Sequence, residues 1–287
     1  MSRRGQILFF APAMLVFLVF VLLPSTQTWI DSFSVTRAGV RHWVGLELYR
    51  YALSDPKFYA ALGNNLIYFL WTLLFEVAVG LALALGLERS TAWSRWLRLI
   101  FFSPAVLSMV VVGLVFGFLF KDGVGLFPGW LNEKNGLLTV SVISGWASAG
   151  FFMVVFLGGL AGIPEEVLEA ARLDGAGRWQ TFWRVKLPLL REVMYVALLV
   201  CFTGAFKAFD LFWVLFRNQE EGTIVATLLV KEFFQFGHAG YGSTLAVLLT
   251  LVVVGGTALG MALWHWIGGG LRRVRSGGLD LQSGRAP

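Results

Sequence analysis

Long apolar stretches alternate with polar segments over almost the whole chain. The hydrocarbon core of a bilayer is about 30 Å thick, so a helix needs roughly 20 mostly apolar residues to cross it. The apolar stretches have about this length and predict six membrane-spanning helices, at 7–23, 62–87, 99–120, 137–160, 193–216 and 243–267. The fold class that this pattern predicts is all-α, a polytopic membrane protein with about six transmembrane helices.

One polar segment, 162–190, separates the fourth and fifth predicted spans and has a helical pattern of its own. Pro164 suits the first turn of a helix, because its missing N–H would have no partner there in any case. Gly175 predicts the end of this helix, since glycine tolerates a left-handed backbone. A second helix is expected from about 178 to 186, ending before Pro188. The segment therefore predicts a hairpin of two short helices beside the bilayer.

The predicted hairpin has a narrow apolar face, formed by Val167, Leu168 and Ala171 in the first helix and by Phe182 and Val185 in the second. One interpretation is an interfacial hairpin that rests on the membrane. The favoured interpretation is docking onto another protein, as amphipathic helices dock into grooves.

Composition agrees with a membrane location. Hydrophobic residues make up 57% and charged residues 14% of the chain, whereas about a quarter of a soluble domain is charged. The formal charge of +6 is attributed to basic residues that flank membrane helices, so no nucleic-acid partner is expected. The single cysteine, Cys201, lies in an apolar run and provides no disulfide framework. Histidine spacing offers no metal site, and no catalytic residue is assigned.

Basic residues orient the predicted spans. An even number of spans places both termini on the same side of the membrane. Lys and Arg residues are more numerous in one alternating set of connections, most clearly in the short loop 88–98 and in the segment 162–190. The positive-inside rule places this set in the cytoplasm. Both termini and the hairpin are therefore expected to face the cytosol.

The hairpin contains a series of residues at a distinctive spacing: Glu169-Ala170-Ala171, Asp174-Gly175-Ala176, Phe182, Val185 and Leu187-Pro188, preceded by Ile163-Pro164 and Glu165. This series resembles a loop of a known family, the membrane subunits of binding-protein-dependent ABC importers. That loop reads Glu-Ala-Ala, two residues, Asp-Gly-Ala, a Phe, an apolar residue and Leu-Pro.

A narrower resemblance, to the first permease partner of the maltose and glycerol-3-phosphate type of sugar importer, extends along the chain. The segments that carry it are 46–50, 54–56, 63–64, 209–210, 236–237 and 241–242. The chain departs from this subgroup after the fifth span, where residues 217–222 replace the usual Gly-Gly-Pro turn. The resemblance implies one importer transmembrane domain, 1–287, with a first helix and outer loop (1–61), a core (62–268) containing the coupling loop 162–190, and a cytoplasmic tail (269–287).

The resemblance further implies that the hairpin inserts into a separate ATPase subunit. Glu169 would make a polar anchor contact there, and Gly175 would permit the sharp turn. The full set of implied coupling residues is Glu169, Ala170, Ala171, Asp174, Gly175, Ala176, Phe182 and Pro188.

The implied partners are a homologous second permease, an ATP-binding cassette ATPase dimer, an extracytoplasmic substrate-binding protein and the lipid bilayer. The chain itself would bind no cofactor, because ATP and Mg²⁺ would sit on the ATPase. The implied location is a bacterial or archaeal cytoplasmic membrane.

Charged residues inside predicted spans cost at least about 2.5 kcal/mol each and need partners or water. Lys207 and Asp210 are three residues apart, which on one helix places them on the same face. They either line a substrate path or form a local ion pair. Glu76 lines the same path or makes a helix–helix contact.

Less direct candidates for the substrate path are aromatic and amide side chains. Phe206 and Phe209 are suited to stacking on sugar rings or to packing between helices. Asn64 lies at the outer end of the second span, where a capping role is the alternative.

The leading hypothesis is therefore a non-enzymatic permease subunit that moves a sugar or sugar-like solute by alternating access. A permease for a glycerol phosphodiester or another polar solute is the alternative. A stand-alone carrier or channel leaves the hairpin unexplained. A membrane-embedded enzyme lacks a His-Glu-x-x-His motif or paired intramembrane aspartates, and the chain has no Gly-x-x-x-x-Gly-Lys-Ser/Thr phosphate loop.

Overall fold

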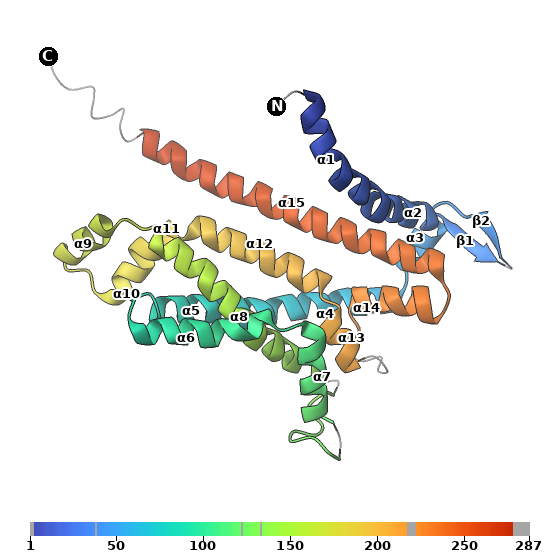
Figure 1. Cartoon of the computed structure of the whole chain (residues 1–287), viewed down its shortest axis with the longest axis horizontal. Coiled ribbons are helices and arrows are strands. Elements are labelled where there is room, and N and C mark those ends of the chain that lie inside the picture. Colours follow the sequence, from blue (N-terminus) through green and yellow to red (C-terminus); the bar gives the residue numbers. More distant parts are fainter. Residues whose placement is uncertain (1–2, 38, 122, 133, 217–221, 278–287) are drawn as a thin grey trace. The chain divides into compact units, whose positions relative to one another are not determined.

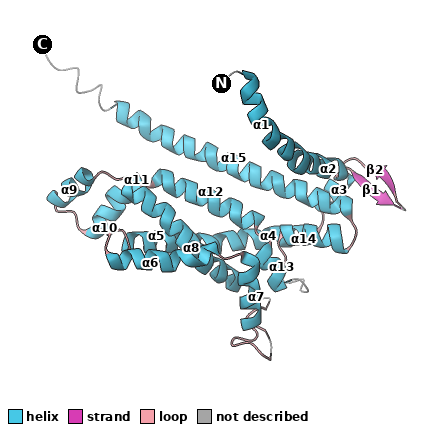
Figure 2. Cartoon of the chain, viewed as in Figure 1, coloured by secondary structure: helices cyan, strands magenta, loops and turns pink. Residues whose placement is uncertain are grey.

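The computed structural model describes residues 3–37, 39–121, 123–132, 134–216 and 222–277 (Figure 1). Helices dominate these residues, and one two-stranded hairpin is the only sheet among them (Figure 2). Five of the described helices are long and apolar enough to cross a membrane, and a bent helix pair makes a sixth candidate. The predicted fold class, an all-α polytopic membrane protein, is confirmed apart from that small sheet.

The N-terminal span runs through α1 (Arg3–Phe17), η1 (Leu18–Leu22) and α2 (Leu23–Asp31). Its apolar part, Phe9–Asp31, ends eight residues later than the predicted span 7–23. No residue in the most apolar part of this helix is buried. An antiparallel hairpin of β1 (Ser34–Arg37) and β2 (Val40–Trp43) follows. The hydrophobic pattern did not predict this hairpin, because its strands are only four residues long.

The chain forms two compact units, and the first comprises Met1–Asn65 and Phe216–Leu251. It contains α3 (Glu47–Ala52), α14 (Val225–Val230) and η5 (Lys231–Gln235), with the beginnings of α4 (Pro56–Thr72) and α15 (Ala239–Gly277). Its core consists of Ala52, Phe58, Ala61, Val225, Leu228, Tyr241 and Leu245.

The second unit comprises Leu66–Leu215 and Val252–Pro287. In it, α4 continues through η2 (Leu73–Ala78) into α5 (Val79–Gly86), giving one apolar helix, Pro56–Gly86. The central element is α8 (Gly136–Ala161), the most buried of the candidate spans. It packs against α5, η2 and α12 (Arg191–Lys207). The core of this unit consists of Val77, Ala84, Phe152, Met153, Phe156, Leu160, Leu190, Ala197 and Cys201.

The predicted span 99–120 does not form one helix. Instead, α6 (Ala92–Phe102) and the short η3 (Ser103–Val106) are followed by α7 (Met109–Leu119), with a 91° bend between them. The bend lies at Leu107 and Ser108, which are extended with ψ 142° and ψ 133°. Pro104, three residues before it, cannot donate a backbone hydrogen bond to the preceding turn. The unbroken hydrophobicity of the stretch concealed the bend.

The last predicted span, 243–267, lies within α15, which continues to Gly277. The predicted tail 269–287 is thus helical at its start, and residues 278–287 lie outside the described residues.

A close backbone approach fixes α8 against α6 at Gly150. A Cβ atom at this position would lie 2.6 Å from the carbonyl carbon of Phe101 and 2.8 Å from the Cα of Phe102. Both neighbours are backbone atoms, so neither can rotate away. Only a residue without a side chain fits here.

We expect Gly150→Ala to destabilise the folded protein by about 1–3 kcal/mol, the usual cost of overpacking a core. Thermal unfolding of the detergent-purified protein measures this as a lower midpoint. Gly158→Ala is the matched control, because it lies on the same helix with no atom within 4 Å of the added Cβ. Equal midpoints for the two variants would contradict the assigned contact.

Candidate functional site

The polar segment forms the hairpin α9 (Glu165–Leu173), α10 (Arg178–Thr181), η4 (Phe182–Lys186) and α11 (Leu187–Leu189). Two helical arms joined at a glycine turn were predicted and are present. The prediction that the second arm ends before Pro188 is wrong. Pro188 instead lies within α11, which continues η4 without a break in the helical backbone.

The turn of the hairpin is a Schellman motif centred on Gly175, whose φ is +77°. The N–H of Gly175 donates to the carbonyl of Arg172 at 3.0 Å, and the N–H of Ala176 donates to that of Ala171 at 2.9 Å. These two bonds satisfy carbonyls that the end of α9 would otherwise leave unpaired. The left-handed residue is therefore built into the turn and reverses the chain sharply after Asp174.

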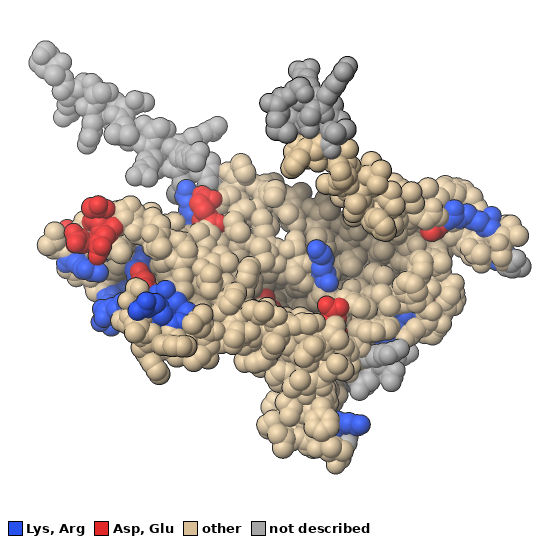
Figure 3. All heavy atoms as spheres, viewed as in Figure 1, with Lys and Arg blue, Asp and Glu red and all other residues tan. Residues whose placement is uncertain are grey.

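The first arm of the hairpin, α9, is not covered by any other described part of the chain. None of the residues of α9 is buried, and Leu173 is 89% exposed. Glu169 is also exposed. Figure 3 shows charged side chains of both signs gathered over α9 and α10, on a face that is otherwise mostly uncharged. An exposed amphipathic helix with this charge density is suited to binding a protein.

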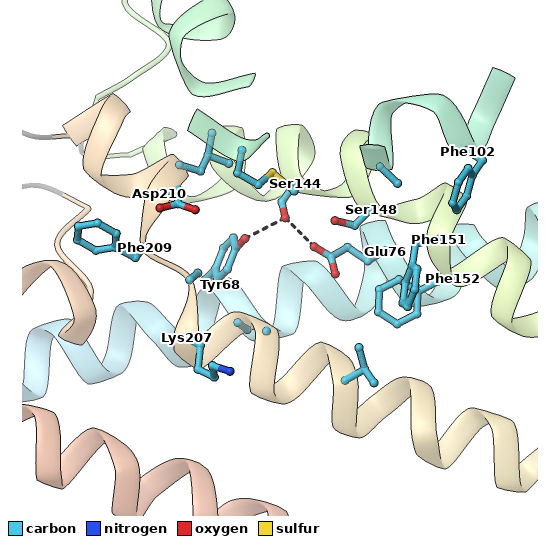
Figure 4. A pocket seen from close by; sticks show the side chains of 17 residues that line it. Tyr68, Glu76, Phe102, Ser144, Ser148, Phe151, Phe152, Lys207, Phe209 and Asp210 are labelled. Carbon is cyan, nitrogen blue, oxygen red and sulfur yellow. Dashed lines mark hydrogen bonds between the residues drawn. The ribbon is translucent and has the colours of Figure 1, made fainter. Parts of the chain in front are cut away.

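A cavity of about 510 Å³ lies within the second unit (Figure 4). Its polar lining comes from Tyr68 and Glu76 on the long helix Pro56–Gly86, from Ser144 and Ser148 on α8, and from the end of α12. A space of this size is in the range of sites for small molecules.

Two consecutive hydrogen bonds join the side chains of one wall of the cavity. The hydroxyl of Tyr68 donates to Ser144 Oγ at 3.0 Å, and Ser144 donates to Glu76 Oε1 at 2.6 Å (Figure 4). Glu76 is only 8% exposed and lies in η2, a π-helical stretch of the kind that often occurs at functional sites. Glu76 thus makes a helix–helix contact, one of the two predicted alternatives, and it also lines the cavity.

A break in the fifth span forms another part of the lining. α12 ends at Lys207, Ala208 is extended with ψ 133°, and α13 (Asp210–Phe216) begins two residues later. The prediction that Lys207 and Asp210 share a helix face is therefore wrong. They point away from one another in Figure 4, and no ion pair joins them among the described residues. Both line the cavity, together with Phe209.

Two other predicted path residues lie elsewhere. Phe206 is buried and packs against Phe202, with ring centroids 4.7 Å apart. The amide of Asn64 donates to the carbonyl of Thr223 at 2.8 Å, which holds the chain just before α14. Neither residue is part of the cavity lining described above.

Three polar residues of the cavity were not predicted from the sequence: Tyr68, Ser144 and Ser148. Their signal was present, because serines inside an otherwise apolar span either bond to their own backbone or face a partner. The serine content of the fourth span was visible, but sequence alone did not indicate which helix lies opposite.

Three comparisons identify similar proteins. Residues 77–273 match the family described as "Binding-protein-dependent transport system inner membrane component". The "Probable ABC transporter permease protein YurN" of Bacillus subtilis (strain 168) is 33% identical over 86% of this chain and 91% of its own length. The "Arabinooligosaccharides transport system permease protein AraP" of the same organism is 33% identical, covering 88% of this chain and 86% of that protein. The "Osmoprotective compounds uptake permease protein GgtC" of Synechocystis sp. (strain ATCC 27184 / PCC 6803 / Kazusa) is 30% identical over 86% and 94%.

The fold is also found in solved structures. A chain of a bacterial ABC transporter involved in the import of the acidic polysaccharide alginate superposes with a TM-score of 0.80 at 19% identity, covering 92% of this chain and 97% of that one. A chain from that bacterial transporter type in complex with an alginate pentasaccharide-bound periplasmic protein also gives 0.80, at 18% identity. At these identities the likeness establishes the fold.

Proposed function

Because the chain belongs to the family of binding-protein-dependent transport system inner membrane components, we propose that it moves a sugar or sugar-like solute into the cell by alternating access. The chain is a multi-pass inner-membrane permease subunit of an ABC transporter, and ATP is bound and hydrolysed on a partner ATPase. It acts together with a binding protein. The family match over 77–273 is the observation that carries the proposal.

The chemistry of the cavity supports a neutral, polyhydroxylated solute. Two carboxyl side chains, Glu76 and Asp210, and one ammonium group, that of Lys207, line the cavity. This balance disfavours an anion such as a glycerol phosphodiester, since like charges in a poorly hydrated site repel strongly. Phe209 offers an aromatic face on which a sugar ring can stack. Similarity to a permease named for arabinooligosaccharides agrees with this solute class.

The subunit is proposed to be the first of two related permeases of the maltose and glycerol-3-phosphate type. Support comes from the sequence segments 46–50, 54–56 and 236–237 that resemble this type. The loop 217–221, where the chain departs from the type, lies outside the described residues. A second, homologous permease would complete the passage across the membrane.

The hairpin is proposed to be the docking element for a dimeric ATPase, with both termini of the chain on the same, cytoplasmic side. The exposed arm α9 and the left-handed turn at Gly175 support this assignment. The contact residues would be Glu169, Ala170, Ala171, Asp174, Gly175, Ala176, Phe182 and Pro188. Closure of the ATPase on ATP would then push the hairpin and rock the spans.

Reconstitution tests the proposal. The chain is purified with its partner permease, the ATPase pair and the binding protein, and the complex is placed in proteoliposomes. We expect uptake of radiolabelled arabino-oligosaccharides that requires both ATP and the ATPase. Excess unlabelled neutral oligosaccharide should compete, and glycerophosphodiesters should not.

Two outcomes would reject parts of the proposal. Uptake that persists without the ATPase would indicate a stand-alone carrier or channel. Uptake of a glycerophosphodiester in place of oligosaccharide would keep the importer but change its solute class.

A further inference from the structure

An ion pair connects the hairpin to the loop that follows α5. Lys186, the last residue of η4, donates from Nζ to a carboxylate oxygen of Glu88, although the two residues are 98 positions apart in sequence. Their side chains are only 17% and 30% exposed. Partly buried pairs are screened much less by salt than fully exposed pairs, so this contact is stronger than an ordinary surface ion pair.

The loop that carries Glu88 is held firmly from the other side. Arg98 on α6 donates to the carbonyl of Leu87 at 2.5 Å and to that of Glu88 at 3.2 Å. Ser94 donates to the carbonyl of Arg89 and forms a capping box with Thr91. With its backbone fixed in this way, Glu88 presents its carboxylate at a defined position. The loop therefore has little freedom to absorb a displacement of Lys186.

The end of α5 leads directly to the cavity. The helix Pro56–Gly86 is continuous and carries Tyr68 and Glu76 on the cavity wall. Glu76 precedes the end of this helix at Gly86 by ten residues, or about 15 Å at 1.5 Å per residue. The hairpin is also joined covalently, through α11, to α12, whose end carries Lys207. The ion pair thus links a second wall of the cavity to the hairpin, in addition to the wall formed by α12.

We infer that Glu88 and Lys186 form a coupling joint: the ion pair makes the helix Pro56–Gly86 follow the hairpin, so that both walls of the cavity move together when the ATPase closes. Both are positioning residues, since neither lies at the cavity or in the exposed arm α9. The inference rests on the proposed function, because it takes the hairpin as the ATPase-docking element. It adds a specific route from that element to Glu76.

Charge reversal tests the joint in the whole transporter. The variants are Glu88→Lys, Lys186→Glu and the double swap, with Arg89→Glu as a matched control on an exposed side chain of the same loop. The first measurement is hydrogen exchange of amides 73–78 with and without a non-hydrolysable ATP analogue, which needs no solute. The second is ATP-dependent uptake of the oligosaccharide used above.

We expect the wild type, the control and the double swap to change their exchange at 73–78 when the nucleotide binds. The single reversals should lose this response while the ATPase still co-purifies. Uptake should fall about tenfold in each single variant, between the effects of exposed and buried ion pairs. The double swap should restore uptake to within about threefold, because the two effects are coupled.

Normal exchange and uptake in both single variants would overturn the joint. So would a double swap that restores neither measurement, or single variants that release the ATPase. A wild-type chain that fails to retain the ATPase would instead reject the proposed function, so the two failures are distinguishable.

Discussion

Gly175→Val is expected to abolish solute uptake while the protein still folds and inserts. The residue has φ +77°, a conformation that costs an L-residue with a side chain about 1–2 kcal/mol, and more when the side chain is β-branched. No atom lies within 4 Å of an added Cβ, so the effect is conformational rather than steric. The strain opens the Schellman turn and removes the fixed angle between α9 and α10. The hairpin then no longer fits the cleft on the ATPase into which it is proposed to insert.

The measurements are co-purification of the ATPase and uptake in proteoliposomes. Gly177→Val is the matched control, because Gly177 lies two residues further on and precedes α10 with φ −65° and ψ 166°, a conformation that residues with a side chain can adopt. Glu169→Lys should also release the ATPase, by reversing the charge of the proposed anchor. If Gly175→Val retains the ATPase as well as Gly177→Val does, the turn is not the docking geometry.

The hairpin could be predicted from the sequence because its structure is determined locally. Pro164, Glu165 and Gly175 specify the start and end of α9 within one short segment, and the surrounding apolar spans contribute nothing to these signals. The break between α12 and α13 had no such signal. Alanine is a good helix former, so the extended backbone of Ala208 runs against its propensity.

Contacts between segments that are far apart along the chain could not be predicted from the sequence either. Ser144 and Glu76 are 68 residues apart, and Glu88 and Lys186 are 98 apart. Periodicity identifies which residues share a face of one helix, but not which helix lies opposite. The polar residues of the cavity could therefore be identified one by one as costly inside a membrane, whereas their assembly into one wall required the fold.

Glu76→Gln is expected to lower uptake about tenfold without lowering stability. The amide oxygen of glutamine still accepts the hydrogen bond that Ser144 donates to Glu76 at 2.6 Å, so the contact between η2 and α8 is kept. What changes is the other oxygen of the carboxyl group, which becomes an NH₂ donor and can no longer accept hydrogen bonds from solute hydroxyls. Leaving one buried polar group unpaired costs about 1–3 kcal/mol, which corresponds to a change in rate of about fivefold to 150-fold.

Comparison with Glu76→Ala separates the two roles of Glu76. The alanine variant should lose both uptake and thermal stability, because it removes the acceptor of the Ser144 hydroxyl and leaves a space in the core of the second unit. Glu192→Gln is the matched control for the chemical change, since its side chain is 65% exposed on α12. Uptake is measured at saturating binding protein, with the unfolding midpoint taken on the same preparations. If Glu76→Gln transports like the wild type while Glu76→Ala unfolds early, Glu76 serves only to join η2 to α8. Lower uptake at an unchanged midpoint places its carboxylate on the path of the solute.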